Sequence, residues 1–523
     1  MKLPFPQLLA GTIPKNHKHS VARPKWEETE RELSMIRMES NGEIKSLIHP
    51  LEIKDRDYAR EVAQLKRLTE RWYADETFRE QFDANPLSTV ANLGLEIDMA
   101  AILDYLTRME RAEGPEEVAE AKATAPLSVR RHKHFIREKL LFREKTRATD
   151  CCPPNPQHKA WRERQIRRTR IQLGAVVHDG IVHVPFTVEL SDGCSVGCWF
   201  CGVTAKKREG DYLYNDGNAA EWQKICGVLR EMFEDSASSG FLYWASEPLD
   251  NPDYEKFAVD FAKICGRFPQ TTTSIAHKDV ERTRNLLKLS NQHGCRINRF
   301  SILSLNQFNK VMEAFSPEEL LHCEIVAQNN ESFFVQGSAG RARGNQKLKD
   351  RMKKKTGAEE ITESPGTIAC VSGFLINMVR RTVRLITPCP ASDKWPNGYW
   401  VIDQGTFSNA QDFKELLQSL IERNLHGDLR YDSPVRLLKD ARVESTLDTI
   451  TIHTPLCVTT FRGYPLAELL AKSIAEGTMT AGQIAVRIED ETGEPAAEIF
   501  AQLNNIFASG VLDEEPLDNT DLG

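Results

Sequence analysis

The chain has 523 residues, which is more than one hydrophobic core usually organises, so three to four domains are expected. Charged residues make up 27% of the chain and hydrophobic residues 40%, and no apolar run approaches the roughly 20 residues of a membrane-spanning helix, which argues against a membrane protein. The formal net charge is −7, so the protein as a whole would not attract nucleic acid, which is itself negatively charged.

The protein is expected to be cytoplasmic, because its amino terminus does not have the pattern of a secretory signal. Two prolines break its short apolar patch (MKLPFPQLLAG), a pattern too weak for a secretory signal. The chain has twelve cysteines, too sparse for a disulfide scaffold in a protein of this length. The clustering of a few of them predicts a metal site in a reducing compartment.

Residues 1–130 are predicted to form a helical domain, because apolar residues recur at three- and four-residue spacing from Tyr58 to Glu113. Within this domain, Asn85 is expected to cap a helix that begins at Pro86, and Gly94 to follow its last turn. Residues 131–180 are strongly basic and are predicted to form a helical linker. Two interpretations of the basic residues stay open: a pair of solvated helices, or a docking face for an acidic peptide.

Strands and amphipathic helices alternate over residues 181–400. Strands are predicted at 183–190, 240–245, 271–276, 298–305 and 323–328, with helices between them. This alternation indicates an α/β fold with a parallel sheet, either open or closed into a barrel. Residues 401–428 are expected to form a connecting helix. Two strand-like and three helical runs in residues 429–523 predict a small winged-helix-like domain that binds a partner.

Three cysteines fall within eight residues, directly after the first predicted strand: Cys194, Cys198 and Cys201. A structural zinc site would need a fourth ligand, usually from a second cysteine pair. Three thiolates on one loop can each bind one iron of a cubane and leave the fourth iron open to a substrate. The competing interpretations are a zinc knuckle or chance spacing.

The spacing C-x3-C-x2-C resembles the cluster motif of radical S-adenosylmethionine (SAM) enzymes. The resemblance implies a partial (βα)6 TIM-type barrel, one [4Fe-4S] cluster and SAM as co-substrate. It also implies SAM contacts at residues that match the family's motifs. These are Phe200, the Ala245-Ser246-Glu247-Pro248 element, Ser301 or Ser304, and Arg341 as a partner for the SAM carboxylate. The Ala245–Pro248 element lacks two glycines of the family pattern.

The order of segments along the whole chain resembles the radical SAM peptide epimerases of proteusin-type ribosomal peptide pathways. The resemblance implies conversion of L- to D-residues in a precursor peptide, with Cys370 returning the hydrogen atom from the barrel mouth opposite SAM. Cys389 is the competing candidate for this role. The remaining cysteines form no further CxxC pair, so no auxiliary cluster is expected.

Residues 78–98 resemble the nitrile-hydratase-type leader of proteusin precursors. This segment is therefore a candidate docking site for a precursor with such a leader, although an ordinary capped helix pair would have the same pattern, and the carboxyl-terminal domain is a second candidate. An electron donor such as a flavodoxin or ferredoxin is implied. The alternative functions are peptide crosslinking or methylation by a radical SAM enzyme, and a non-catalytic scaffold that binds the precursor.

Overall fold

The computed structural model describes residues 26–357 and 366–516. Residues 1–25, which begin the predicted helical domain and include the segment tested for a secretory signal, lie outside the described residues. Residues 517–523, at the end of the predicted carboxyl-terminal domain, also lie outside them. Within the described part of the chain, no helix is both long and apolar enough to cross a bilayer.

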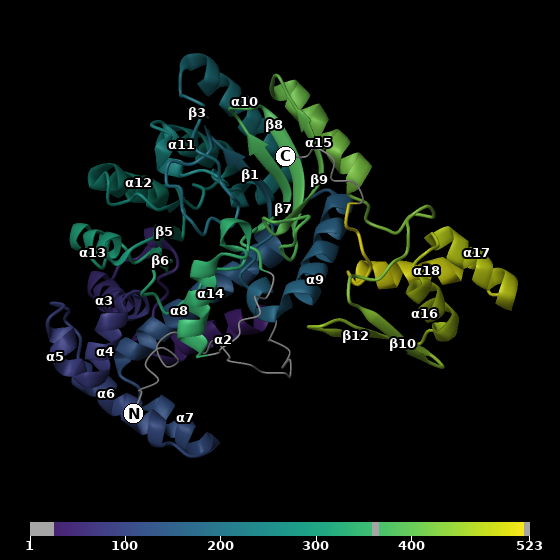
Figure 1. Cartoon of the computed structure of the whole chain (residues 1–523). Coiled ribbons are helices and arrows are strands. Elements are labelled where there is room, and N and C mark those ends of the chain that lie inside the picture. Colours follow the sequence, from purple (N-terminus) through teal and green to yellow (C-terminus); the bar gives the residue numbers. More distant parts are fainter. Residues whose placement is uncertain (1–25, 358–365, 517–523) are drawn as a thin grey trace.

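The described amino-terminal region is helical, as predicted (Figure 1). Its helices are α2 (Trp26–Glu39), α3 (Arg56–Ala74), α4 (Glu76–Ala84), α5 (Pro86–Ala91), α6 (Met99–Arg111), α7 (Pro115–Ala123) and α8 (Leu127–Lys145). The predicted punctuation of α5 is confirmed. The side chain of Asn85 accepts a hydrogen bond from the Ser88 amide, Pro86 opens the helix, and Gly94 beyond its end has a φ of 64°.

The predicted boundary between residues 130 and 131 is wrong, because α8 begins directly after Pro126 and continues without interruption to Lys145. A second long helix, α9 (Pro156–His178), follows, with non-helical backbone at Gly174. Three arginines of α9 lie on its buried face and not on a solvated one. Arg162, Arg164 and Arg168 are at most 2% exposed, so both interpretations of this basic segment are wrong for the inner face of α9.

These three buried arginines connect α9 to other parts of the chain. Arg162 donates to the carbonyls of His183 at 2.8 Å and Val182 at 3.1 Å, at the entrance to the first strand. Arg164 makes a bidentate ion pair with Glu514, both contacts at 2.9 Å. Because each guanidinium carries five donors in a rigid fork, one side chain can satisfy several buried acceptors at once.

The first sheet has the order β1-β7-β8-β9. Its strands are β1 (Val184–Glu189), β7 (Val371–Asn377), β8 (Thr382–Pro388) and β9 (Tyr399–Thr406). β1 and β7 are parallel, with Val184 opposite Val371 and Glu189 opposite Asn377. β8 and β9 are added in antiparallel directions.

The second sheet is parallel and has the order β4-β5-β6: β4 (Thr272–Thr273), β5 (Asn298–Ile302) and β6 (Cys323–Ala327). The predicted strand at 240–245 lies beside β1, where Thr187 and Phe241 form a single parallel bridge. A short antiparallel pair, β2 (Ser191–Asp192) with β3 (Gly210–Asp211), follows β1.

The structure is therefore a mixed α/β fold, but its strand pairing differs from the predicted array of parallel strands. The antiparallel β7–β8 hairpin replaces a crossover helix. The side chain of Asn377 accepts hydrogen bonds from the amides of Val379 and Arg380 at 3.0 and 2.8 Å, and Arg381 has a φ of 54°, so the chain reverses within a few residues. The predicted boundary at 400 is also wrong, because β9 crosses it.

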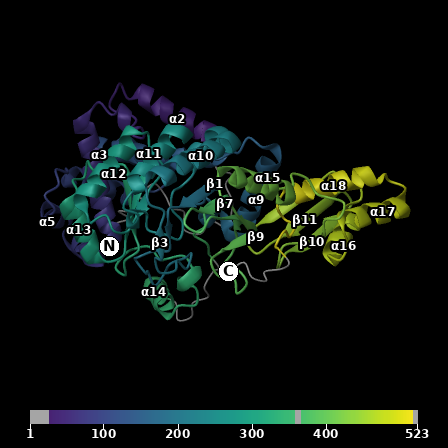
Figure 2. The same ribbon diagram turned by 90° about the horizontal axis from the view of Figure 1, so that it is seen from above.

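Helices cover one face of the strands. They are α10 (Asp216–Phe233), α11 (Tyr254–Cys265), α12 (Val280–Gln292), α13 (Leu305–Ala314) and α15 (Ala410–Asn424), whereas α14 (Gln346–Thr356) lies apart from them (Figure 2). Phe186 and Val188 of β1 belong to the same core cluster as residues of α10, α11 and α15. Since successive side chains point to opposite faces of a strand, Thr187 and Glu189 point away from these helices, into the interior.

The carboxyl-terminal unit lies at the far end of the molecule from the amino-terminal helices (Figures 1 and 2). The three predicted helices are present: α16 (Ala467–Glu476), α17 (Ala481–Thr492) and α18 (Ala496–Ala508). They accompany an antiparallel sheet in the order β10-β11-β12: β10 (Arg442–Thr446), β11 (Thr449–His453) and β12 (Val458–Arg462). The sequence predicts the first two strands but not β12.

Candidate functional site

The three predicted cluster ligands lie on a loop at the carboxyl ends of β1 and β2, named here the cysteine loop (residues 193–202). All three thiols are free and half-buried. Burial, followed by the neighbouring thiols of Cys194 and Cys201, raises the pKa of Cys198 to about 11, because like charges would repel. The three sulfur atoms therefore lie close enough to influence one another.

Backbone amides point at two of these sulfurs. The Val196 amide lies 3.5 Å from Sγ of Cys194, and the Ala205 amide lies 3.3 Å from Sγ of Cys201. Such donors favour thiolates, the form that binds iron. In residues 26–357 and 366–516, no three His, Cys, Asp or Glu side chains are already arranged around a common metal position. The donor set thus fits a cluster by its chemistry, although the side chains are not gathered around one point.

The segment of residues 337–341, which contains the predicted Arg341, packs directly on the cysteine loop. Gly340 has a φ of 56°, and a Cβ there would lie 2.3 Å from the Cys201 carbonyl oxygen, so only glycine fits. The Arg341 amide donates to the Cys201 carbonyl at 3.0 Å. Its guanidinium donates to the Cys198 carbonyl at 3.0 Å and to the Ala205 carbonyl. In this structure Arg341 therefore holds the loop backbone, rather than standing free for a SAM carboxylate.

The Ala245–Pro248 element lies beside the same loop. Glu247 is 3% exposed and accepts hydrogen bonds from the Ser274 amide and hydroxyl, both at 2.8 Å. Burial raises the pKa of Glu247, and burial, with the Glu247 carboxylate as a smaller cause, raises the pKa of Cys194. Two residues beyond Pro248, Asp250 accepts from the Ser195 amide at 2.8 Å and the Ser195 hydroxyl at 2.6 Å. The element and the cysteine loop thus form one surface.

The two candidate serines of the fourth predicted strand have different positions. Ser304 caps α13 by accepting a hydrogen bond from the Gln307 amide at 3.1 Å. Ser301 lies on β5, between Phe300 and Ile302, both buried in a helix-facing core, so its side chain points to the interior face. Phe200 is half-buried, and its ring meets the Trp199 ring edge-on at 5.3 Å.

Sequence reasoning missed a set of carboxylates at the ends of the strands. Glu189 closes β1, accepts a hydrogen bond from the Ala245 amide at 2.8 Å, and has a pKa raised by burial. Asp192 pairs with Lys206 at 2.6 Å and with Arg380 at 2.8 Å. The sequence position of these carboxylates could have identified them, because both come just before Cys194 at the carboxyl end of a predicted strand.

Cys370 lies at the opposite end of the strands from the cysteine loop. It precedes β7, and its carbonyl accepts a hydrogen bond from the Val184 amide at the start of β1. Because β1 and β7 are parallel and a strand rises about 3.3 Å per residue, Cys370 is separated from the cysteine loop by the length of β1, roughly 17 Å. The expected location at the barrel mouth is therefore wrong.

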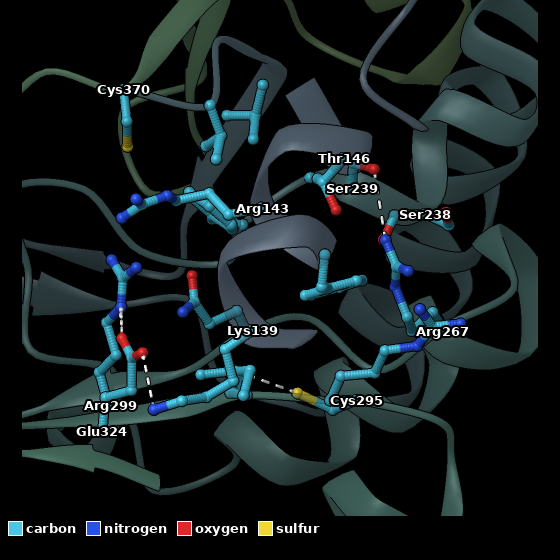
Figure 3. A pocket seen from close by; sticks show the side chains of 18 of the residues that line it. Lys139, Arg143, Thr146, Ser238, Ser239, Arg267, Cys295, Arg299, Glu324 and Cys370 are labelled. Atoms are coloured by element: carbon cyan, nitrogen blue, oxygen red, sulfur yellow. Dashed lines mark hydrogen bonds and ion pairs between the residues drawn. The ribbon is translucent and has the colours of Figure 1, made fainter. Parts of the chain in front are cut away.

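The Cys370 thiol instead lines a cavity at the amino ends of the parallel strands (Figure 3). Burial raises its pKa to about 11, so the thiol keeps its proton at neutral pH. Cys389, the competing candidate, is 1% exposed and packs within an apolar cluster beside Trp395 and Trp400. Of the two thiols, only that of Cys370 is among the residues that line this cavity.

Comparisons with known proteins give one strong match. No family model matches the chain. The chain resembles the crystal structure of BtrN in complex with AdoMet and 2-DOIA at a TM-score of 0.28 and 14% identity, over 46% of this chain and 82% of that one; a TM-score this low does not relate the two folds. An uncharacterized protein of Sinorhizobium fredii (strain NBRC 101917 / NGR234), y4wI, is 36% identical over 468 residues, which cover 87% of this chain and 88% of the relative. The chain belongs to the same family as y4wI.

Proposed function

We propose that this protein is a radical SAM enzyme that converts L- to D-amino-acid residues in a ribosomally made precursor peptide. Cys194, Cys198 and Cys201 would hold one [4Fe-4S] cluster, and Cys370 would return a hydrogen atom to the peptide. The observation that carries the proposal is the cysteine loop: its three thiols follow the carboxyl end of β1, the edge of a parallel sheet where functional groups gather.

When bound, the cluster and SAM supply a 5′-deoxyadenosyl radical that removes the α-hydrogen of a peptide residue. The chain's contribution is to hold the cysteine loop and to shape the space beside it. Arg341 and Gly340 hold the loop, while Phe200, Ala245, Ser246, Glu247 and Ser301 are the residues we place around SAM. Ser304 is the less suitable of the two serines, because it already caps α13.

Inversion requires hydrogen to leave one face of the α-carbon and return to the other. Cys370 and the cysteine loop lie at opposite ends of β1, so we propose that the reacting residue reaches between these two ends, with the donor on the far face of its α-carbon. The S–H bond of Cys370 breaks and a new C–H bond forms. The sulfur radical that remains needs one electron and one proton, for which we propose a flavodoxin or ferredoxin as the electron donor.

We propose as substrate a precursor peptide with a nitrile-hydratase-like leader. Two parts of the chain are candidates for leader binding. In the leader-like segment 78–98, Phe78, Phe82 and Val90 pack into the amino-terminal core, while Leu87 is 52% exposed. In the carboxyl-terminal unit, Tyr431 stacks on Phe500 beside a hollow that also includes Val486.

The test is co-expression of the full chain with a precursor that carries such a leader, in deuterium oxide, followed by mass spectrometry. We expect a gain of about one dalton per inverted residue, because the thiol exchanges its proton with solvent before donating it. Cys370→Ala should still cleave SAM but install no D-residues. Cys389→Ala is the matched control and should retain epimerisation.

Other outcomes would redirect the proposal. Loss of epimerisation in Cys389→Ala alone would show that the donor is misassigned. A gain of about 14 Da would indicate methylation, and a loss of about 2 Da would indicate crosslinking. Precursor binding without any 5′-deoxyadenosine would indicate a scaffold.

A further inference from the structure

The cavity that Cys370 lines, named here the amino-end cavity, has a volume of about 170 Å³. It lies at the amino ends of the parallel strands, where Val184, Arg299 and Glu324 begin or nearly begin β1, β5 and β6. Helix α8 forms its opposite wall through residues that include Lys139 and Arg143 (Figure 3). The cavity is therefore separate from the surface formed by the cysteine loop.

The lining of this cavity contains more positive than negative charge. It includes five cationic side chains and a single carboxylate: Lys139, Arg143, Arg267, Arg296, Arg299 and Glu324. Glu324 lies 3.5 Å from Lys139 and 3.4 Å from Arg299. Burial alone would raise the pKa of Glu324, but the cations Lys139, Arg299 and Arg143 lower it to about 2. Glu324 is therefore ionised at neutral pH, and these three cations already balance its charge.

Two of the remaining cations are partnered within the protein. Arg267 donates to the Ser238 carbonyl and the Ser239 hydroxyl, both at 3.3 Å. Arg296 lies over the Phe142 ring at 4.8 Å from its centre.

Arg143 differs from these arginines. Among the described residues its side chain makes no hydrogen bond or ion pair, and its Nε is shielded from solvent with no partner. Figure 3 shows its side chain in the cavity with no interaction drawn to it, on the side where Cys370 and Arg299 lie. Burial lowers the pKa of Arg143, which is the sign of a charge held in an unfavourable environment.

Lys139, Arg143 and Arg299 share the single carboxylate of Glu324, so this group of half-buried side chains keeps a surplus of positive charge, which is unfavourable. A bound anion would remove this cost. The guanidinium fork matches the two oxygens of a carboxylate in particular. The retained negative charge of Glu324 disfavours a dianion such as phosphate at the same place.

The rest of the lining is largely apolar and includes Val182, Val184, Phe241 and Phe268. A protein cavity of about 150 Å³ is large enough to hold benzene. We propose that the amino-end cavity binds a monocarboxylate with an apolar body about the size of one aromatic ring, and that Arg143 and Arg299 hold the carboxylate. The carboxylate can belong to a free small molecule or to a residue of a peptide.

Benzoate is a suitable probe, and benzamide is its neutral counterpart of the same shape. Calorimetric titration of the full chain should show benzoate binding at one site, with benzamide binding weaker by about tenfold or more, the scale of one lost charge-assisted hydrogen bond. Arg143→Gln should weaken benzoate by a similar factor. Arg137→Gln is the matched control, because Arg137 lies on α8 outside the cavity and pairs with Glu32; it should leave benzoate affinity unchanged.

A second measurement distinguishes ligand binding from a structural role. Without ligand, Arg143→Gln should melt at the same temperature as the parent or higher, because no side-chain hydrogen bond is lost and Glu324 keeps its ion pairs with Lys139 and Arg299. A peptide that ends in phenylalanine should compete with benzoate if the cavity accepts peptide carboxylates, and should not compete if it accepts only free molecules.

The proposal fails if benzoate does not bind at tens of millimolar, if benzamide binds equally well, or if Arg143→Gln lowers the melting temperature and leaves affinity intact. Preference for inorganic phosphate over benzoate would also overturn it. These titrations need neither cluster nor turnover, so their outcome is independent of the proposed function.

Discussion

At the scale of single residues, Gly340 and Arg341 determine how the cysteine loop is held. Gly340 allows two backbone segments to touch, and Arg341 uses its amide and its guanidinium to bind three carbonyls of the residues around Cys198 and Cys201. These contacts restrict the backbone of the loop, which reduces the ordering that cluster binding must impose.

We predict that Gly340→Ala disrupts this contact. A methyl group would meet the Cys201 carbonyl at 2.3 Å in a backbone conformation that already disfavours alanine, so the free energy of unfolding should fall by roughly 3 kcal/mol. Iron loading on reconstitution should fall as well. Gly344→Ala is the control: its φ is 68°, but its methyl group would meet nothing within 4 Å, so only about 1–2 kcal/mol of backbone strain is expected. Equal losses in the two variants would show that the contact does not matter.

The sequence predicts these site residues with uneven success. The three cysteines and the Ala245–Pro248 element could be placed together, because both follow predicted strands and the carboxyl ends of parallel strands meet at one edge. The end at which Cys370 lies could not be predicted, because it depends on where β7 begins and how it aligns with β1. A shift of a few residues in strand start moves such a side chain from one end of a sheet to the other.

At the scale of elements, α9 joins the strands to the carboxyl-terminal unit. Ile171 of α9 packs in the core of that unit, and a Cβ at Gly510 would lie 2.7 Å from the Arg168 amide, so the helix and the tail are in direct contact. The role of α9 was not predictable from composition, because arginines are almost always exposed unless they are paired. The helix caps and the helices of the tail were predictable, since each depends on local sequence alone.

We predict that Arg168→Met destabilises the protein. Arg168 donates to the Pro388 carbonyl at 2.7 Å and the Thr387 hydroxyl at 3.2 Å, and lies over the Trp400 ring at 3.7 Å. Loss of these bonds leaves buried acceptors unsatisfied and should lower the free energy of unfolding by roughly 2–4 kcal/mol in chemical denaturation.

Arg170→Met is the matched control for this measurement. Arg170 lies on the same helix with an exposed side chain, and its replacement should change stability by less than about 0.5 kcal/mol. If the two variants were equally stable, the buried arginines would not connect the elements as described.

At the scale of the whole molecule, acid stability is expected to depend on buried neutral histidines. Burial, followed by the charge of Arg162, lowers the pKa of His158 to about 3, and burial lowers the pKa of His322 to about 4. His183 is shifted in the same direction by burial. In the unfolded chain these rings take up protons near their ordinary pKa of 6.5, whereas in the folded chain they do not.

Stability from these histidines is therefore complete above about pH 6.5 and is lost as the pH falls towards their folded values. Each contributes a slope of up to about 1.4 kcal/mol per pH unit. We predict that the free energy of unfolding, measured by urea denaturation, falls steadily from pH 6.5 to about pH 5, before most carboxyl groups titrate. A flat profile over that interval would contradict the burial of neutral histidines.

The proposed function requires that the cysteine loop holds a cluster that cleaves SAM, and this can be tested without the peptide substrate. The measurement is 5′-deoxyadenosine formation by the full chain after anaerobic reconstitution with iron and sulfide, on addition of SAM and dithionite. We expect 5′-deoxyadenosine from the parent chain and from Cys370→Ala, and none from Cys198→Ala. Absence of the product from a parent chain that has taken up iron, or equal product from Cys198→Ala, would contradict the proposed function.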